Sequence, residues 1–502
     1  MNIKIVFSIL FLLGNLIAQV ETNFSYEVKY GDGKQVKTKG SSTPTQYNYF
    51  ENLLDISTYF GSNTYVFTQM EYSNKPVYGV QRTSVDSMIN SFYVEYNRES
   101  YLIKLGDLYE LIGRGLSFYT LQDQNIDYNN SVKGAYFNYW GRDNFEISGL
   151  YGLGDYYYRS NPSFRETDRE ISSNIFVGSF RYENDMLGYL NYSFKFQNIH
   201  HNPKQNNFYG GTEIGDDIID RANDITSQVF DIYYGNIDIH DTVVVINNNL
   251  NWNTFVGPLD IYLDKSWINY DKIYGERVSG SRFYTSIYTE ILETGITYEY
   301  KNYNTPYLLK SVSNPPIVYR EGNSILASRN AHSINFGNEI GHQLEVNKNL
   351  LGSLNLLGNL SMSFRHQNDM MADMSIIDFL RMEENDQIYE YFPFRQFYLE
   401  LNGWTLSDRL YYKLGIDQFT EFNVGSKNIF ATTIPTQWVW KLRSGSSITT
   451  YLEFQDKTVK GPIPGNYSNF YISSSFSYQG KWIITGFYDQ EISEDKTSQW
   501  PG

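Results

Sequence analysis

The chain has 502 residues, and 40 Lys and Arg against 56 Asp and Glu give it a net charge of −16. This acidic balance argues against a nucleic-acid-binding surface, which needs a basic face. The absence of cysteine excludes a disulfide framework, Cys-ligated zinc, iron–sulfur clusters and a thiol nucleophile.

The N-terminal residues predict a cleaved secretory signal, residues 1–18. Lys4 supplies a positive charge, residues 5–13 form a short apolar core, and Ala18 offers a small residue at the cleavage position. The apolar run is too short for a membrane-spanning helix, which needs about 20 residues. We therefore expect an exported protein whose mature part, residues 19–502, is a single domain.

Beyond residue 20 the dominant hydrophobic period is two. In residues 186–197, Leu190, Tyr192, Phe194 and Phe196 alternate with polar residues. Such alternation marks strands with one apolar and one polar face. Aromatic residues make up 17% of the chain, and many segments have the length of a tilted membrane strand, about 9–11 residues or more. Long alternating strands with aromatic residues near their ends are typical of outer-membrane barrels.

Tight turns and longer connections alternate along the chain, as bacterial barrels require. The tight turns are predicted at residues 61–63, 97–99, 141–144, 183–185, 256–258, 293–295, 347–349, 407–409, 444–445 and 479–480. The longer, outer connections are predicted at residues 31–48, 74–87, 109–131, 158–171, 199–243, 272–280, 304–330, 367–392, 424–429 and 457–466.

This scheme gives about 21 strands, with the strand-like residues 225–240 placed inside the connection 199–243. The fold class predicted is all-β, a large antiparallel transmembrane β-barrel of about 20–24 strands. Single-chain bacterial barrels have even strand numbers, and the polar tail 494–502 has the composition of a loop. We expect a further strand beyond an incomplete C-terminus; a misassigned strand, for instance residues 23–30, is the alternative.

Charged residues at polar-face positions are candidates to line the lumen, because charge facing lipid is costly. They could form a pore lining that sets selectivity, or a structural ladder of ion pairs, which is the favoured interpretation for any one of them. The candidate pore-lining residues are Glu95, Lys104, Arg114, Arg181, Lys195, Arg365, Glu400, Lys413, Asp417, Glu421, Lys441 and Glu453.

Three connections invite a sharper hypothesis. Residues 106–119 break the alternation and are rich in Gly, which fits an inward-folded constriction loop, although a plain bulge or outer loop is favoured. His200 and His201 precede an acidic stretch, but its spacing matches no calcium loop and a solvated outer loop is favoured. Residues 367–392 could hold a short helix, packed at the barrel mouth or contacting a partner.

No hydrolase, metalloprotease, P-loop or dinucleotide-binding motif is present, so no enzyme, cofactor or metal site is predicted. A Ser–His–acid site assembled by the fold stays open, since such triads are recognised by geometry.

The signal sequence, residues 106–137 (GDLYELIGRGLSFYTLQDQNIDYNNSVKGAYF) and the tail 494–502 resemble the uncharacterised outer-membrane barrels of Bacteroidetes and related marine bacteria, the family DUF6029. The resemblance implies an outer-membrane barrel over most of the chain and one more C-terminal strand. It brings no substrate or catalytic residue.

The function expected is a porin-like channel of the outer membrane of a Gram-negative bacterium, for passive transport of small polar solutes. The alternative is a non-conducting structural or partner-binding component, such as a secretion or surface-assembly accessory. The lipid bilayer is the expected partner, nucleic acid is not, and no protein partner can be named.

Overall fold

The computed structural model describes residues 20–35, 45–73, 89–123, 128–142, 144–158, 169–203, 242–273, 276–305, 312–322, 324–330, 332, 334, 336–366, 393–422, 428–442, 445–460 and 464–493. By their contacts these residues divide into two units. The first comprises residues 1–252, 264–281 and 306–315, and the second residues 253–263, 282–305 and 316–502.

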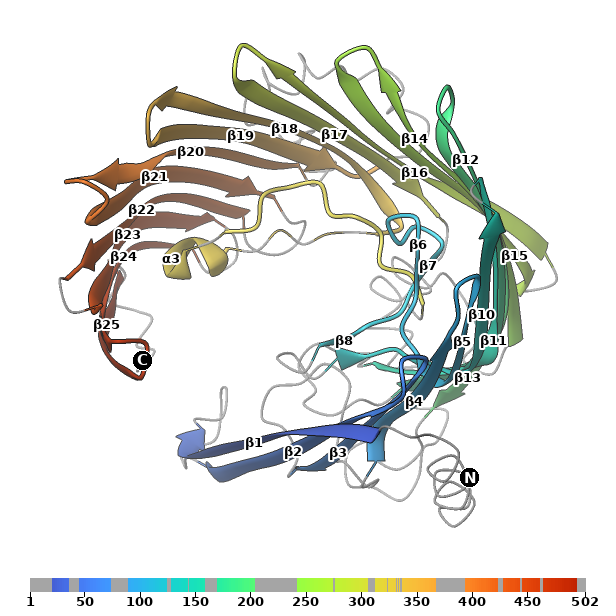
Figure 1. Ribbon diagram of the computed structural model, residues 1–502. Coiled ribbons are helices and arrows are strands. Elements are labelled where there is room, and N and C mark those ends of the chain that lie inside the picture. Colours follow the sequence, from blue (N-terminus) through green and yellow to red (C-terminus); the bar gives the residue numbers. More distant parts are fainter. Residues whose placement is uncertain are drawn as a thin grey trace, which may run out of the picture. The chain divides into compact units, whose positions relative to one another are not determined.

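The first unit contains nine consecutive strands of the large sheet. Each strand pairs with the next one along the chain in antiparallel fashion (Figure 1). They are β1 (Val20–Gln35), β2 (Thr45–Phe60), β3 (Thr64–Ser73), β4 (Ile89–Asn97), β5 (Tyr101–Leu108), β10 (Val132–Arg142), β11 (Phe145–Tyr158), β12 (Arg169–Asn184) and β13 (Gly188–Pro203).

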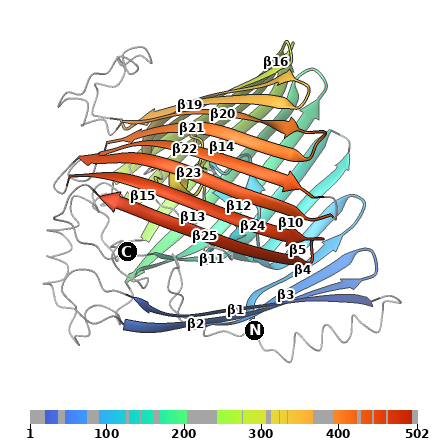
Figure 2. The same ribbon diagram turned by 90° about the vertical axis from the view of Figure 1, so that its left-hand side faces the viewer.

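The second unit repeats this up-and-down arrangement, and Figure 2 shows its last strands as neighbouring rows in chain order. Its strands are β17 (Thr294–Asn304), β18 (Asn338–Leu351), β19 (Leu354–Phe364), β20 (Phe394–Thr405), β21 (Leu410–Glu421), β22 (Asn428–Lys441), β23 (Ser447–Lys460), β24 (Gly465–Tyr478) and β25 (Trp482–Ser493). The residues of β14 (Thr242–Val256), β15 (Leu259–Ile273) and β16 (Glu276–Ile291) are divided between the units.

Within the described residues these elements form one 21-stranded sheet, and four short strands and one short helix lie outside it. The predicted fold class is confirmed as all-β with one large antiparallel sheet, and its 21 described strands lie within the predicted range. Residues 23–30 are indeed a strand, as the scheme required. Among the residues described, no helix has the length and hydropathy needed to cross a membrane.

The two faces of the strands differ in the opposite sense from those of a soluble protein. On β20 the side chains of Phe397 and Leu399 are 41% and 39% exposed, whereas Gln396 and Glu400 are 3% and 6% exposed. The predicted split of β13 is confirmed too, with Leu190, Tyr192 and Phe196 exposed and the polar residues between them buried. We call these the apolar face and the polar face of the sheet.

One predicted tight turn lies wholly within a strand. Asn347, Lys348 and Asn349 lie within β18, and the reversal to β19 is made by Gly352 and Ser353. Gly352 has a φ of 58°, a left-handed conformation that glycine adopts without the steric cost of a Cβ. The polar residues at 347–349 suggested a turn, but the reversal needs a left-handed backbone conformation, which Gly352 adopts more easily than Asn or Lys.

Candidate functional site

The polar face of the first unit carries paired charges. The Lys104 ammonium lies 3.3 Å from Glu95 and 2.7 Å from Glu110. Arg181 forms ion pairs with Glu146 at 3.0 Å and with Glu183 at 3.2 Å. The pairs Lys104–Glu95 and Arg181–Glu146 cross between neighbouring strands and help to hold them together.

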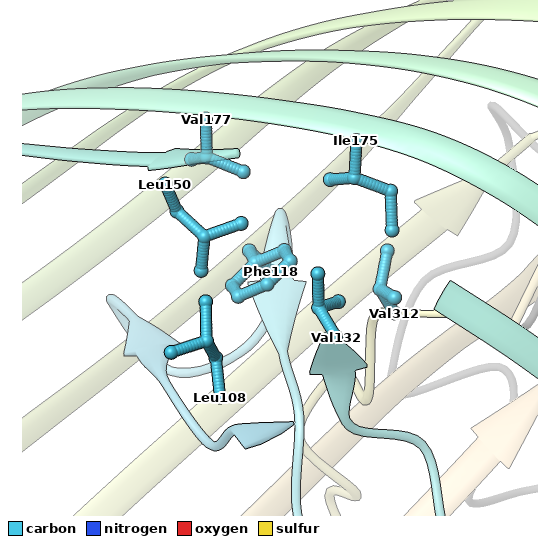
Figure 3. Close-up of a cluster of buried hydrophobic side chains, with 7 residues drawn as sticks. All are labelled: Leu108, Phe118, Val132, Leu150, Ile175, Val177 and Val312. Carbon is cyan, nitrogen blue, oxygen red and sulfur yellow. The ribbon is translucent and has the colours of Figure 1, made fainter. Parts of the chain in front are cut away.

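A short hairpin folds over this polar face. It is formed by β6 (Leu111–Ile112) and β7 (Phe118–Tyr119), and a second pair of two-residue strands follows, β8 (Gln122–Asp123) and β9 (Tyr128–Asn129). We call residues 109–119 the inserted hairpin. Phe118 is fully buried in an apolar cluster and lies at its centre (Figure 3). The other members, from β5, β10, β11, β12 and residue 312, are Leu108, Val132, Leu150, Ile175, Val177 and Val312.

Polar contacts fix the tip of the inserted hairpin. The buried Lys195 ammonium donates to the carbonyl of Ser117 at 2.7 Å, and the backbone N–H of Arg114 donates to Asp264 at 3.2 Å. Gly115 has a φ of 86°, and a Cβ at this position would lie 2.6 Å from the carbonyl oxygen of Asn314. The expectation of a plain bulge or outer loop is therefore wrong. The segment folds over the polar face, where it buries Phe118 and accepts a hydrogen bond from the Lys195 ammonium.

A pocket of about 200 Å³ lies between the inserted hairpin and β10–β13. Glu110 and Ile112 line it from the hairpin, and Glu146 and Arg181 from the sheet. Burial raises the pKa of Glu110, while the adjacent Lys104 ammonium opposes that shift. Two tyrosine rings, hydroxyl and amide groups and several apolar side chains form the rest of the wall: Tyr136, Ser148, Ser179, Tyr189, Asn191, Leu111, Phe118, Leu150 and Val177.

In the second unit, part of the connection between β17 and β18 also folds over the polar face. We call the described residues between Pro316 and Ile334 the strap. It contains the short helix α3 (Ile325–Ser328), which lies against β22–β24 (Figure 1). Glu453 of β23 accepts hydrogen bonds from the backbone N–H groups of Ile325 at 3.0 Å and Leu326 at 2.7 Å. The connection 304–330, predicted as an outer loop, therefore partly covers the sheet.

His332 anchors the end of the strap between two carboxylates. Its Nδ1 lies 3.2 Å from Glu421 and its Nε2 lies 3.3 Å from Glu339, which also pairs with Lys301 at 2.5 Å. The imidazole stacks on Phe394 with ring centroids 4.1 Å apart. Burial lowers the pKa of His332, but hydrogen bonds and charge from the two carboxylates outweigh it and leave the pKa raised above 6.5.

Arg320 joins the strap to a second group of charges. Its guanidinium lies 4.2 Å above the ring of Tyr398 and 3.5 Å from Glu345. Glu400 lies 4.0 Å from both Arg320 and Lys413, and its remaining contacts are to Tyr398 and Asn402. A cation placed among several acceptors and over an aromatic ring holds the strap in one position.

The strap also brings a serine, a histidine and a carboxylate together. The Ser363 hydroxyl lies 2.9 Å from Nε2 of His332, whose Nδ1 contacts Glu421. This order matches that of a hydrolytic triad. Ser363 is 1% exposed, however, and Glu339 competes for the same nitrogen. A nucleophile must reach its substrate, so we interpret the three residues as a structural anchor.

The structure places most candidate pore-lining residues on the polar face, in ion pairs or hydrogen bonds. Asp417 accepts from Gln396 at 2.8 Å. Lys195 and Glu453 bind inserted segments, and Arg114 lies in the inserted hairpin itself. Lys441 is exposed at the end of β22, with its ammonium 3.7 Å from the Trp404 ring centroid. Arg365 follows β19 and is half-buried.

Several residues of these clusters were not predicted from the sequence: Glu110, Glu146, Lys301, Arg320, His332 and Glu339. Strand parity could have found Glu146, which lies between Phe145 and Ile147. Lys301 and Glu339 each have an Asn on one side, so the alternation is weaker there. Arg320 and His332 lie in a connection, where no periodicity signals a position. Across the described ranges no group of three or more His, Cys, Asp or Glu side chains is arranged to hold a metal ion.

Some predictions fall outside the described residues. These are the signal peptide 1–18, most of the acidic stretch after His200 and His201, the segment 225–240, the loop 367–392 and the tail 494–502.

The family model of DUF6029, described as a family of unknown function, matches residues 4–210. The predicted resemblance to this family is thereby confirmed over those residues. No curated protein matches the chain.

Similar solved structures include a BenF-like porin from Pseudomonas fluorescens Pf-5, with 7% identity, a TM-score of 0.37 and coverage of 95% of this chain and 100% of that one. OccK3 (OpdO) of Pseudomonas aeruginosa has 11% identity, a TM-score of 0.38 and coverage of 95% and 98%. The FrpB iron transporter from Neisseria meningitidis has 10% identity, a TM-score of 0.42 and coverage of 96% and 82%.

Proposed function

We propose that the chain is a β-barrel of the Gram-negative outer membrane that acts as a porin-like channel for passive transport of small polar solutes. The observation that carries this proposal is the inversion of the two sheet faces. Large apolar side chains, such as Phe397 and Leu399, are exposed in rows, while charged and amide side chains are buried between them. Hydrocarbon around the barrel and water within it would satisfy both faces.

Strand length and number support the same location. Apart from β5, which has 8 residues, the strands of the large sheet have 9 to 16 residues, enough to span a bilayer when tilted. Barrels of 16–18 strands leave an aqueous channel, so a sheet of 21 strands has room for two inserted segments beside a water-filled path. Export through a signal at residues 1–18 belongs to the same proposal.

A non-conducting barrel that binds a partner is the second candidate. The inserted hairpin and the strap favour it, because both cover the polar face with the chain's own residues and are held by buried contacts such as Lys195 to Ser117. A lumen filled in this way would serve assembly rather than transport.

Planar-bilayer recordings on the refolded protein separate the two candidates. The heat-modifiable gel shift of a folded barrel establishes that each preparation is native before recording. Stepwise channels in KCl, together with swelling of proteoliposomes in uncharged solutes, are expected for a porin. A folded barrel that neither conducts nor swells liposomes would contradict the channel and support the partner-binding candidate.

A further inference from the structure

Each carboxylate that lines the pocket beneath the inserted hairpin is already paired with a cation. Glu110 is paired with Lys104 at 2.7 Å, and Glu146 is paired with Arg181 at 3.0 Å. The second oxygen of Glu146 accepts from Asn138 at 2.5 Å. A solute with a net charge would have to displace one of these partners, and breaking a partly buried ion pair leaves the other charge poorly solvated. The charge pattern therefore favours a neutral ligand.

Beside the apolar side chains of the wall, the other lining groups are suited to hydroxyl groups and to sugar-like rings. Ser148, Ser179 and Asn191 bring neutral donors and acceptors to the wall, and Tyr136 and Tyr189 bring aromatic rings. Arg181 lies 4.2 Å over the Tyr189 ring, so this ring is held in place. Aromatic faces pack on apolar C–H surfaces while polar neighbours hydrogen-bond to the ligand, which is how small-molecule sites combine affinity and orientation.

The volume fits a small solute. The pocket has a volume of about 200 Å³. This is less than the 300–1,000 Å³ of ordinary drug-sized sites, and it suits a six-carbon polyol or monosaccharide.

We propose that the pocket between the inserted hairpin and β10–β13 is a binding site for a neutral, polyhydroxylated solute of monosaccharide size. This inference rests on the proposed channel, for which it names a solute class, but the site itself can be tested without conduction.

Equilibrium calorimetry on the folded protein in detergent at pH 6 tests it with three probes of matched size: glucose, gluconate and glucosamine. We expect saturable binding of glucose, about tenfold tighter than that of the anion or the cation, a difference of about 1.4 kcal/mol. Absence of saturable glucose binding, or equal or tighter binding of a charged probe, would overturn the proposal.

Variants locate the site. Tyr189→Ala should weaken glucose binding about tenfold, whereas Tyr151→Ala, which removes an exposed ring on the apolar face, should leave it unchanged. Glu110→Gln leaves Lys104 without one of its carboxylates and should shift the preference toward gluconate. Arg181→Gln should shift it toward glucosamine. Equal losses in Tyr189→Ala and Tyr151→Ala, or charge variants that leave the preference unchanged, would place binding elsewhere.

Conductance in KCl keeps this test distinct from that of the channel. A protein that conducts but does not bind glucose would overturn the solute site and retain the channel. A protein that binds glucose with the expected preference but never conducts would retain the site and reject transport.

Discussion

Glu453 on β23 holds the first turn of α3 through Leu326, whose backbone N–H lies 2.7 Å from the carboxylate. The two residues are 127 positions apart in the chain. Gln455, two residues further along the same strand, donates to the carbonyl of Leu326 at 2.8 Å. One strand thus binds both a donor and an acceptor of the strap.

Glu453→Ala should loosen α3 without unfolding the sheet. Hydrogen bonds to a charged acceptor contribute about 1.5–3 kcal/mol, so the amides of Ile325 and Leu326 should exchange with solvent at least about tenfold faster. Hydrogen-exchange mass spectrometry of peptides covering α3 measures this. The matched control is Glu290→Ala, which removes an exposed carboxylate of β16. Unchanged exchange in the Glu453 variant would mean that α3 is held by other contacts.

Anchoring of the strap at His332 should depend on pH. The folded pKa of His332 is raised above the unfolded value of 6.5, so its stabilisation is complete below pH 6.5 and is lost as pH rises through the raised pKa. The groups facing it are Glu339, Glu421, Tyr319 and, through Glu339, Lys301. Burial and nearby carboxylates raise the pKa of Tyr319 to about 12, so it stays neutral across this window.

Proteolysis of the strap, measured from pH 6 upward, should therefore accelerate in the wild type, and His332→Gln should remove this dependence. His366 gives the opposite control. Burial lowers its pKa, so its neutral form is favoured in the folded state, and any contribution it makes to pH-dependent stability is lost below pH 6.5. A wild-type protein whose strap is equally protected at all these pH values would contradict the role of His332.

Phe118→Ala should release the inserted hairpin. Removing a buried Phe side chain costs about 3–5 kcal/mol of stability. The pair β6–β7 has only two residues in each strand, so it depends on the packing of Phe118 in this cluster. Cleavage between residues 111 and 119 and a larger single-channel conductance are expected. Leu111→Ala, in the same hairpin but 54% exposed, should change neither. Conductance that stays constant although the hairpin becomes cleavable would show that it does not narrow the path.

A charged side chain introduced on the apolar face should lower the free energy of unfolding far more than one introduced on the polar face. Leu399→Arg, near the middle of β20, is expected to lower the free energy of unfolding in lipid vesicles by about 2–4 kcal/mol. Asn402→Arg places the same charge on the polar face, close to Glu400, and should cost less than about 1 kcal/mol. Guanidinium titrations of both variants check this. Equal costs would argue against lipid at Leu399.

The strand pattern of the sheet could be predicted from the sequence because each face repeats every second residue. All 21 strands of the large sheet correspond to predicted segments, and the alternation in β13 gave its faces correctly. The turn after β18 was misplaced because Asn and Lys favour turns as residue types, whereas the left-handed conformation at Gly352 depends on where the pairing with β19 ends.

The inserted segments could not be predicted in the same way. Val312 joins the cluster around Phe118, and Glu453 binds Leu326, through contacts between residues far apart in the sequence. No local period encodes such contacts. For the same reason the group formed by His332, Ser363 and Glu421 appears only once the chain is folded, although a meeting of these residue types was left open.

Strict alternation between the two faces also constrains how the gene for this protein can change. Deleting one residue before Leu399 would bring Glu400 to the hydrocarbon side and Leu399 to the water side, and every later side chain of β20 would follow. A single codon lost within a strand is therefore far more damaging than several gained in a connection. Length variation among natural relatives should accumulate between the strands, while the strands themselves keep constant length and tolerate substitution.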